Sequence, residues 1–256
     1  MPFTPTHTLA ILPLWPVRRY LPFVALAIGA MVPDTPLFFP VLDYAQTHSL
    51  WGVLTVCVPL GVSLFLLFEM VCRQPLLALS PTWLQQRIAG ESQIPSAPQL
   101  NIQVSFYLGV AGAVAIGAIS HQVWDAFTHQ NRWGTDLVPM LQHSYTIIGY
   151  AIKGHKLFQY GSTLLGLPVF AMLAWSYLRR VEKQKRDIQM INQKWKWTAS
   201  LVCILTPVLL GVHSLVTQPN VYQAIGTTIK LSGATIALIA IAFCIGYHLV
   251  VQNNNA

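Results

Sequence analysis

The chain has 256 residues, of which 54% are hydrophobic and only 9% are charged. A soluble domain usually carries about 25% charged residues, so this composition excludes an ordinary soluble fold and favours a membrane protein. The net charge of +7 does not indicate nucleic-acid binding, because seven of the fifteen Lys and Arg residues lie in one short segment, Arg179 to Lys196. We therefore expect the lipid bilayer, and no nucleic acid, as a partner.

The N-terminal part of the chain predicts a helical hairpin. Its two apolar runs, His7 to Trp15 and Leu21 to Val32, hold 9 and 12 residues, whereas crossing a bilayer takes roughly 20. The segment Pro16-Val17-Arg18-Arg19-Tyr20 separates them and predicts a reversal of the chain. Such a hairpin would bring His7 and Asp34 to the same open end. Because the N-terminus lacks a basic start and its apolar runs are broken by Pro13, Pro16 and Arg18-Arg19, we expect no cleaved signal peptide.

Five later segments are long and apolar enough to cross a bilayer. They predict an all-α integral membrane helical bundle, with about five spans plus the N-terminal hairpin. We treat residues 1–256 as a single membrane domain, in which residues 1–180 carry the candidate site and 181–256 hold a basic loop and two C-terminal spans. The predicted spans cover about residues 49–72, 103–128, 159–178, 197–216 and 226–250.

Basic residues predict how the spans are oriented. The loops 73–102 and 179–196 together hold nine Lys and Arg, and the loop 129–158 holds three. Loops rich in Lys and Arg stay on the cytoplasmic side. We therefore predict that the loop 129–158 is extracytoplasmic and that the C-terminus is cytoplasmic.

The few acids and histidines of the chain gather beside the apolar runs. The chain has eight Asp or Glu and eight His, and His121, Asp125 and His129 are spaced four residues apart. On a helix this spacing places them on one stripe. Burying such groups is costly unless they are paired, bound to metal or functional. Imidazole and carboxylate are common ligands of zinc and similar ions, so the stripe predicts a metal site.

One helix cannot easily close a coordination sphere, so further ligands must come from elsewhere in the chain. Asp34 lies between Pro33 and Thr35-Pro36, in a stiff loop that presents one carboxylate. His48 stands just before a predicted span. With more than three or four ligands, a two-metal site becomes possible. We predict Asp125 as a ligand or a catalytic base, within the metal-ligand set His7, Asp34, His48, His121, Asp125 and His129.

Non-metal interpretations of these residues stay open. Asp34 could cap the helix that begins at Thr35, and the stripe on the third span could be a structural polar network. Lone histidines within spans, His213 and His248, are expected to bond a neighbouring helix. Glu69 and Arg73 are four residues apart and predict an ion pair at the end of a span.

Several motifs together resemble a known family. The opening Met1-Pro2-Phe3-Thr4-Pro5-Thr6-His7, the segment Gly29-Ala30-Met31-Val32-Pro33-Asp34 and the segment Ser120-His121-Gln122-Val123-Trp124-Asp125-Ala126-Phe127-Thr128-His129 carry the resemblance. They resemble a family of bacterial multi-pass membrane proteins that is known by its domain of unknown function. The resemblance covers roughly residues 1–180. It implies a place in the bacterial inner membrane, and it carries no established activity.

The order His…Pro-Asp…His-Ser…His-x-x-x-Asp has a second, more distant resemblance. It is similar to bacterial inner-membrane proteins classed as metal-dependent hydrolases, and to the ligand order of zinc-dependent phospholipase C. This resemblance implies zinc as cofactor, the six ligands named above, His143 as a further member, and a lipid or phosphoester substrate. The sequence departs from the phospholipases in lacking their final His-x-x-x-Glu, since Ile147 stands four residues after His143, and in beginning with Met1 where they begin with a ligating tryptophan. A one- or two-metal site is therefore expected rather than a three-metal site.

Two classes of function follow from these observations. We favour a metal-dependent hydrolase at the extracytoplasmic face, acting on a lipid or another membrane-proximal phosphoester. The alternative is a non-catalytic membrane protein, either a structural polar network or an ion or proton transporter. A transport path would carry polar residues across the membrane, and Glu69, His213, Lys230 and His248 would have to line it. The substrate and the oligomeric state leave no mark in the sequence.

Overall fold

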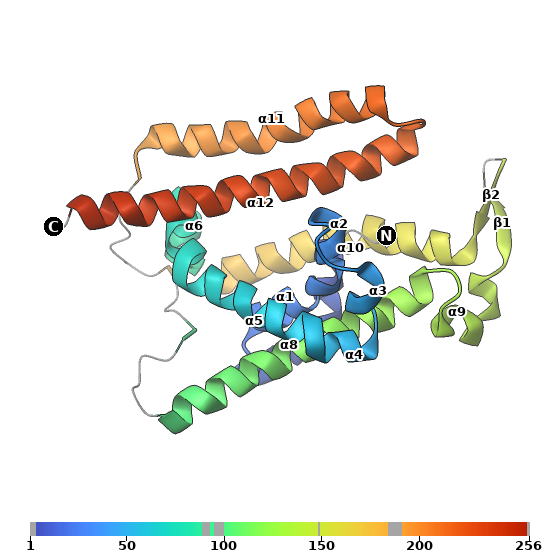
Figure 1. Cartoon of the computed structure of the whole chain (residues 1–256), viewed down its shortest axis with the longest axis horizontal. Coiled ribbons are helices and arrows are strands. Elements are labelled where there is room, and N and C mark those ends of the chain that lie inside the picture. Colours follow the sequence, from blue (N-terminus) through green and yellow to red (C-terminus); the bar gives the residue numbers. More distant parts are fainter. Residues whose placement is uncertain (1–3, 89–92, 95–99, 148, 184–190, 255–256) are drawn as a thin grey trace. The chain divides into compact units, whose positions relative to one another are not determined.

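The computed structural model describes residues 4–88, 93–94, 100–147, 149–183 and 191–254. Helices dominate this part of the chain (Figure 1). The predicted all-α membrane bundle is confirmed, and the chain is a multi-pass membrane protein. Five helices are long and apolar enough to cross a membrane: Leu50–Leu79, Gln103–Thr128, Gly154–Arg180, Gln193–Thr217 and Val221–Val250.

The chain forms two compact units. The first comprises Met1–Pro36, Val41–Phe65 and Gln93–Arg179, and the second comprises Leu37–Pro40, Leu66–Ser92 and Arg180–Ala256. All six candidate site residues belong to the first unit. The division does not decide whether the chain is one membrane domain, which stays a prediction.

The N-terminal hairpin of the first unit consists of two short helices. It begins with the 3₁₀ helix η1 (Thr4–Val17), which contains Pro13 and Pro16, and returns in α1 (Phe23–Gly29). A proline cannot donate the bond that an α-helix needs, and η1 keeps the tighter 3₁₀ winding over 14 residues, an uncommon length. The two arms contact each other. The predicted hairpin is therefore present, with a first arm that is not an α-helix.

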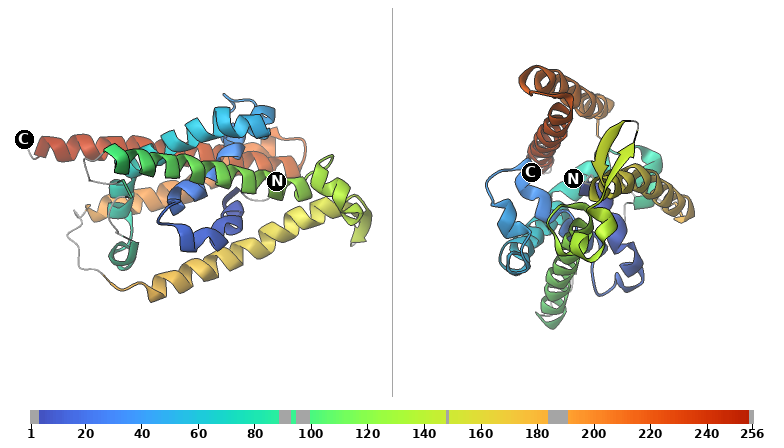
Figure 2. Two further views of the ribbon diagram at one scale, coloured as in Figure 1. Left: turned by 90° about the horizontal axis from the view of Figure 1, so that it is seen from below. Right: turned by 90° about the vertical axis from the view of Figure 1, so that its right-hand side faces the viewer.

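Helix α8 (Leu100–Thr128) packs against both arms of this hairpin (Figure 2). Two glycines allow α1 and α8 to approach closely. A Cβ atom on Gly117 would collide with the Leu26 carbonyl oxygen, and one on Gly29 would lie 2.7 Å from the Val114 Cα. Because these positions carry no side chain, the end of α1 at Ala30 lies against α8.

The first span is a continuous helix with two π turns. Each π turn is followed closely by a proline, Pro59 or Pro75, whose missing N–H leaves the carbonyl four residues earlier without its usual partner. The sequence predicted a loop from residue 73 onward, and this was wrong. The helix continues because Pro75 lies in the first turn of its last segment, where proline is tolerated. The segments are α4 (Leu50–Gly52), η3 (Val53–Cys57), α5 (Val58–Leu67), η4 (Phe68–Cys72) and α6 (Arg73–Leu79).

Short elements fill the connections. The segment after α8 contains a β hairpin that the sequence analysis did not predict: β1 (Ser144–Ile147) pairs antiparallel with β2 (Tyr150–Lys153). Gly149 has a φ of 80° at its turn, a conformation that favours glycine. The remaining short helices are η2 (Val32–Asp34), α2 (Thr35–Phe38), α3 (Tyr44–Thr47), α7 (Thr82–Ile88), α9 (Trp133–Leu137) and η5 (Pro139–Leu141).

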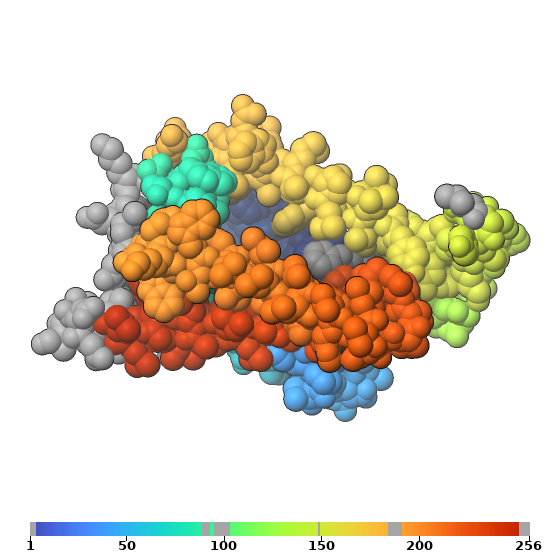
Figure 3. All heavy atoms as spheres, turned by 90° about the horizontal axis from the view of Figure 1, so that it is seen from above, coloured from blue at the N-terminus to red at the C-terminus, as the bar shows by residue number. Residues whose placement is uncertain are grey.

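Three long helices complete the chain: α10 (Gly154–Arg180), α11 (Gln193–Thr217) and α12 (Val221–Asn254). In the second unit α11 and α12 pack along each other, as the space-filling view shows in orange and red (Figure 3). His248 Nε2 lies 2.9 Å from the Val71 carbonyl, as expected for a lone histidine in a span. The predicted ion pair is also present, with Arg73 Nε 3.7 Å from Glu69 Oε2.

Candidate metal centre

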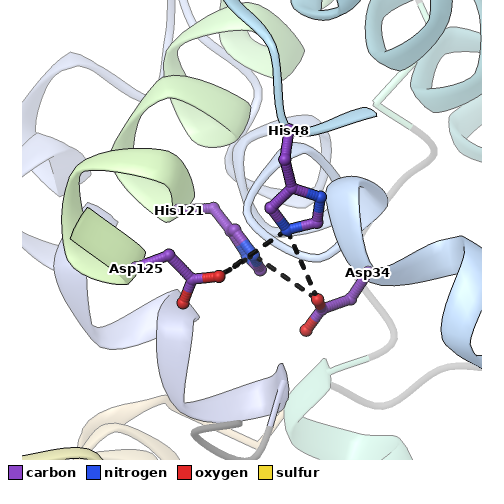
Figure 4. Close-up of side chains that lie close together, drawn as sticks. All are labelled: Asp34, His48, His121 and Asp125. Carbon is purple, nitrogen blue, oxygen red and sulfur yellow. Dashed lines mark ion pairs between the residues drawn. The ribbon is translucent and has the colours of Figure 1, made fainter. Parts of the chain in front are cut away.

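Four buried side chains of the first unit point into one small space (Figure 4). One ligand atom from each lies within 4.8 Å of the others. Two of the residues come from α8, and the other two come from η2 and from the end of α3. The four residues are Asp34, His48, His121 and Asp125.

His121 is held by a backbone bond to the N-terminal hairpin. Its Nδ1 lies 2.8 Å from the Ala30 carbonyl oxygen, which can only accept a hydrogen bond, so Nδ1 carries the proton. Nε2 then offers a lone pair, and it lies 3.6 Å from Asp34 Oδ1 and 3.5 Å from Asp125 Oδ2. A carbonyl that fixes the tautomer of a histidine in this way is typical of metal ligands.

His48 is oriented in the same manner by its own helix. Its Nδ1 lies 3.1 Å from the Tyr44 carbonyl, and its ring stacks on the Tyr44 ring with centroids 3.7 Å apart. Nε2 points at the two carboxylates, 3.8 Å from Asp34 Oδ1 and 3.6 Å from Asp125 Oδ2. The chain turns sharply just after His48, because Gly52 has no Cβ to collide with the Gln46 carbonyl.

Asp34 uses one carboxylate oxygen for support and presents the other to the imidazoles. Oδ2 accepts a hydrogen bond of 2.7 Å from the Thr4 hydroxyl, while the buried Oδ1 has no hydrogen-bond partner among the described residues. Burial raises the pKa of this carboxyl above its ordinary value. Among the described residues neither oxygen accepts a backbone N–H, so the alternative prediction that Asp34 caps a helix has no support.

Asp125 faces two sets of groups with its two oxygens. Oδ2 belongs to the four-atom cluster. Oδ1 lies 3.8 Å from His7 Nε2, 3.5 Å from His129 Nδ1 and 3.4 Å from the Thr128 hydroxyl. This carboxylate therefore connects the cluster to the other two predicted histidines.

His7 lies beside the cluster, with its Nε2 3.8 Å from Asp125 Oδ1. Its ring stacks on that of His121, with centroids 3.9 Å apart and planes inclined by 21°. The side chain is buried, and neither nitrogen has a hydrogen-bond partner among the described residues. Burial lowers the pKa of His7 to about 3, with the neighbouring His121 adding to the shift, so the ring is neutral at physiological pH.

The hydrogen-bond partners of Gln159 determine which ring nitrogen of His129 carries the proton. Lys156 Nζ donates to Gln159 Oε1 over 2.9 Å, so the Gln159 amide nitrogen faces His129 Nε2, 3.3 Å away. The proton of His129 therefore sits on Nδ1, which lies 3.2 Å from the Asp125 carbonyl. In this arrangement His129 orients Asp125, and its role as a metal ligand stays a prediction. His143, the proposed further member, is exposed and packs edge-on against Tyr145.

The sequence analysis missed the groups that hold the ligands. Thr4, Tyr44 and Gln159 were not singled out, and neither was the carbonyl of Ala30. Gln159 could have been noticed in the sequence, because it is an uncharged polar residue in a largely apolar segment. The structure shows that it is fully buried, where a polar side chain needs a hydrogen-bond partner. Backbone carbonyls give no such signal, since every residue has one.

The cluster contains an unusual number of unsatisfied atoms. Asp34 Oδ1, His48 Nε2 and His121 Nε2 are buried without a hydrogen-bond partner among the described residues. The four nitrogen–oxygen separations between the two imidazoles and the two carboxylates, 3.5 to 3.8 Å, exceed the usual hydrogen-bond length. Leaving a buried polar atom unsatisfied costs about 1–3 kcal/mol, so three atoms at one point need a common partner. A metal ion could be that partner.

Comparisons with known proteins identify the family and go no further. A family model matches residues 1–251, and its description is Domain of unknown function (DUF4184). The match extends beyond residues 1–180, on which the resemblance rested, and includes the two C-terminal spans. No curated protein and no solved structure matched the chain.

Proposed function

The chain belongs to the family described as Domain of unknown function (DUF4184), and from its site we propose that it is a membrane-embedded metal-dependent hydrolase. Its substrate would be a lipid or another membrane-proximal phosphoester. The observation that carries the proposal is the convergence of three unsatisfied buried atoms and one further carboxylate oxygen on a single point. The Nδ1–H of each of the two imidazoles donates a hydrogen bond to a backbone carbonyl oxygen.

Zinc fits this arrangement best among the common divalent ions. Two ligands bound to one tetrahedral zinc at 2.0–2.2 Å lie about 3.3–3.6 Å apart. The four nitrogen–oxygen separations in the cluster are 3.5, 3.6, 3.6 and 3.8 Å. Two imidazoles and two carboxylates also suit zinc better than magnesium or calcium, which prefer oxygen ligands alone.

The residues around the cluster can be assigned roles in hydrolysis. Asp34, His48, His121 and Asp125 would hold the ion. Because four protein ligands complete a tetrahedron, water would have to bind as a fifth ligand, and the ion would supply polarisation of a phosphoester oxygen and a more acidic water. Asp125 Oδ1 lies outside the four-atom group and is the oxygen available to accept a proton. His7 and His129 flank this oxygen and keep it in position.

The proposal places the enzyme in the bacterial inner membrane with its site at the extracytoplasmic face. The support for this orientation is the distribution of Lys and Arg among the loops. Asp34, His48 and His129 all lie at or just beyond the ends of apolar segments, as a site at a membrane surface requires.

Metal content tests the proposal directly. Mass spectrometry of detergent-purified protein should find about one equivalent of zinc or another divalent ion in the wild type and almost none in His121→Ala. His155→Ala is the matched control, because His155 is equally buried in the first unit and bonds the Leu141 carbonyl away from the cluster. A wild-type protein that is folded, metal-free and unable to take up added zinc would end the hydrolase proposal.

The non-catalytic alternative has less support. A structural polar network would satisfy its own members with hydrogen bonds of ordinary length, whereas the nitrogen and oxygen atoms of this cluster lie 3.5 to 3.8 Å apart. For a transporter, Glu69, His213, Lys230 and His248 would have to share a path. In the second unit Glu69 is buried against Arg73 and His248 bonds a carbonyl, while His213 and Lys230 are exposed.

A further inference from the structure

A cavity adjoins the metal centre in the first unit. It has a volume of about 370 Å³, and its lining includes His48 and Asp125, two of the four clustered residues. A molecule in this cavity would therefore lie next to the cluster. The volume is within the range of ordinary ligand pockets, about 300–1,000 Å³.

The walls of this cavity are apolar and include residues that a bilayer would cover. Ile119 and Val123 line it from α8, one helical turn apart, and both lie inside the span Gln103–Thr128. Each is 44% exposed in the protein, and so is in contact with lipid when the span crosses a membrane. Leu50 and Trp133 add two more exposed apolar side chains to the lining. With the span in a bilayer, the cavity would therefore be bordered by the cluster on one side and by lipid-facing residues of α8 on another.

One cation lies in this apolar lining. Arg132 lines the cavity four residues beyond the end of α8, and it has no ion-pair partner within the described ranges. A guanidinium can bind a phosphate with two parallel hydrogen bonds. Beside the cluster, an unpaired arginine is suited to a phosphate group, and the apolar walls are suited to the chain attached to it.

We infer that this cavity binds a membrane lipid with a phosphate-bearing headgroup, with Arg132 pairing with the phosphate and the Ile119–Val123 face taking the start of the acyl chains. The inference deepens the proposed function, on which it rests for the fate of the bound lipid. In this inference Ile119 and Val123 make the cavity prefer a lipid over a soluble phosphoester, and Arg132 recognises the negative charge of the phosphate.

Binding measurements with two pairs of variants test this inference. Dioctanoyl phosphatidic acid would be titrated into detergent-solubilised protein by calorimetry. We expect Arg132→Gln to weaken binding about tenfold or more, as for loss of a charged hydrogen bond. Lys153→Gln is its control, because Lys153 is an exposed cation in the same connecting segment and does not line the cavity. It should change the dissociation constant less than about twofold.

The second pair tests the apolar wall. Val123→Trp should fill the cavity and abolish binding of the lipid. Val104→Trp is matched to it, since Val104 is 49% exposed on the same helix and lies outside the lining. Glycerol 3-phosphate, which has the phosphate without the chains, should bind at least about tenfold more weakly than the lipid, given the apolar area it cannot bury.

The outcomes separate this inference from the proposed function. Equal binding of glycerol 3-phosphate and lipid, or lipid binding unchanged in both Arg132→Gln and Val123→Trp, would overturn the lipid assignment. Release of a soluble phosphate from lipid by the wild type, measured separately, tests hydrolysis. Lipid binding that depends on Arg132 and Val123, with no hydrolysis of the lipid, would support the inference and contradict the proposed function. Lipid hydrolysis that is unchanged in both variants would support the proposed function and contradict the inference.

Discussion

Two histidines, one in each unit, make the same kind of hydrogen bond to a backbone carbonyl but differ in what surrounds their second ring nitrogen. His121 Nδ1 lies 2.8 Å from the Ala30 carbonyl, and His248 Nε2 lies 2.9 Å from the Val71 carbonyl. Both rings therefore satisfy a backbone oxygen on a neighbouring segment. The free nitrogen of His121 faces two buried carboxylates, whereas His248 has no carboxylate within ion-pair distance among the described residues. What distinguishes a candidate ligand is thus the surroundings of its second nitrogen.

The same contrast holds for two buried carboxylates, Asp34 in the first unit and Glu69 in the second, and it leads to the largest expected effect. Asp34→Asn keeps the shape of the side chain and removes its charge, so the bound metal should fall from about one equivalent to near zero. Glu69→Gln makes the same change in the second unit, where Glu69 pairs with Arg73, and should leave the metal content unchanged. Elemental analysis of the purified variants measures both. Full metal retention in Asp34→Asn would show that the Asp34 carboxylate is not a metal ligand.

The support beneath a ligand should have a smaller effect than the ligand itself. Thr4→Val removes the hydroxyl that donates to Asp34 Oδ2, and loss of such a supporting bond typically lowers metal affinity ~10–100-fold. Thr8→Val removes a similar hydroxyl from the same helix, one that donates to the Pro5 carbonyl, and should leave the affinity within about twofold. Competition with a chelating dye gives both affinities. Equal metal affinities in the two variants would show that the hydrogen bond from Thr4 to Asp34 does not contribute to metal binding.

Helix packing offers a third comparison between the units. Gly117→Ala would force a methyl group into the α1 backbone, and overpacking of this kind costs about 1–3 kcal/mol. Gly246→Ala on α12 meets nothing within 4 Å, so it should be neutral or stabilise the helix by up to ~1 kcal/mol. Thermal unfolding in detergent ranks the two variants. An unchanged melting temperature for Gly117→Ala would mean that α1 and α8 are not closely packed.

The smallest effect is expected at His248 itself. His248→Ala leaves the Val71 carbonyl without its side-chain partner, and hydrogen bonds between membrane helices average ~0.6 kcal/mol. We expect a small fall in the melting temperature and an unchanged metal content. Loss of metal in this variant, with His121 intact, would show that the two histidines are not functionally distinct.

Much of the candidate site could be predicted from the sequence because its ligands are rare in such a chain. His121 and Asp125 follow from helical spacing, and Asp34 and His48 from polar residues at the edges of apolar runs. The supporting atoms could not be predicted, since Ala30 contributes a backbone carbonyl that looks like any other. The positions of His7 and His129 relative to the ligands also required the fold.

The fold was predictable where hydrophobicity decides it. The five spans follow from apolar length, but the continuation of the first span through Leu79 does not, because Pro75 resembles a helix-ending signal. The same residue is compatible with a helix when it falls in a first turn after a π turn. The hairpin of β1 and β2 was missed because a short exposed strand pair has no buried face to create an alternating pattern.

The hydrogen bond between His121 and Ala30 can form only late in synthesis of the chain, because α8 is made long after the N-terminal hairpin. Its partners are 91 positions apart in the chain, and at 5–20 residues per second a ribosome needs on the order of 5–20 s to make the intervening segment. During that interval the N-terminal hairpin has been made but has no α8 to dock against. Asp34 and His48 are then complete while half of their ligand set does not yet exist. An ion held by all four residues could therefore be captured only after α8 has been made, and until then the hairpin has no α8 to dock against.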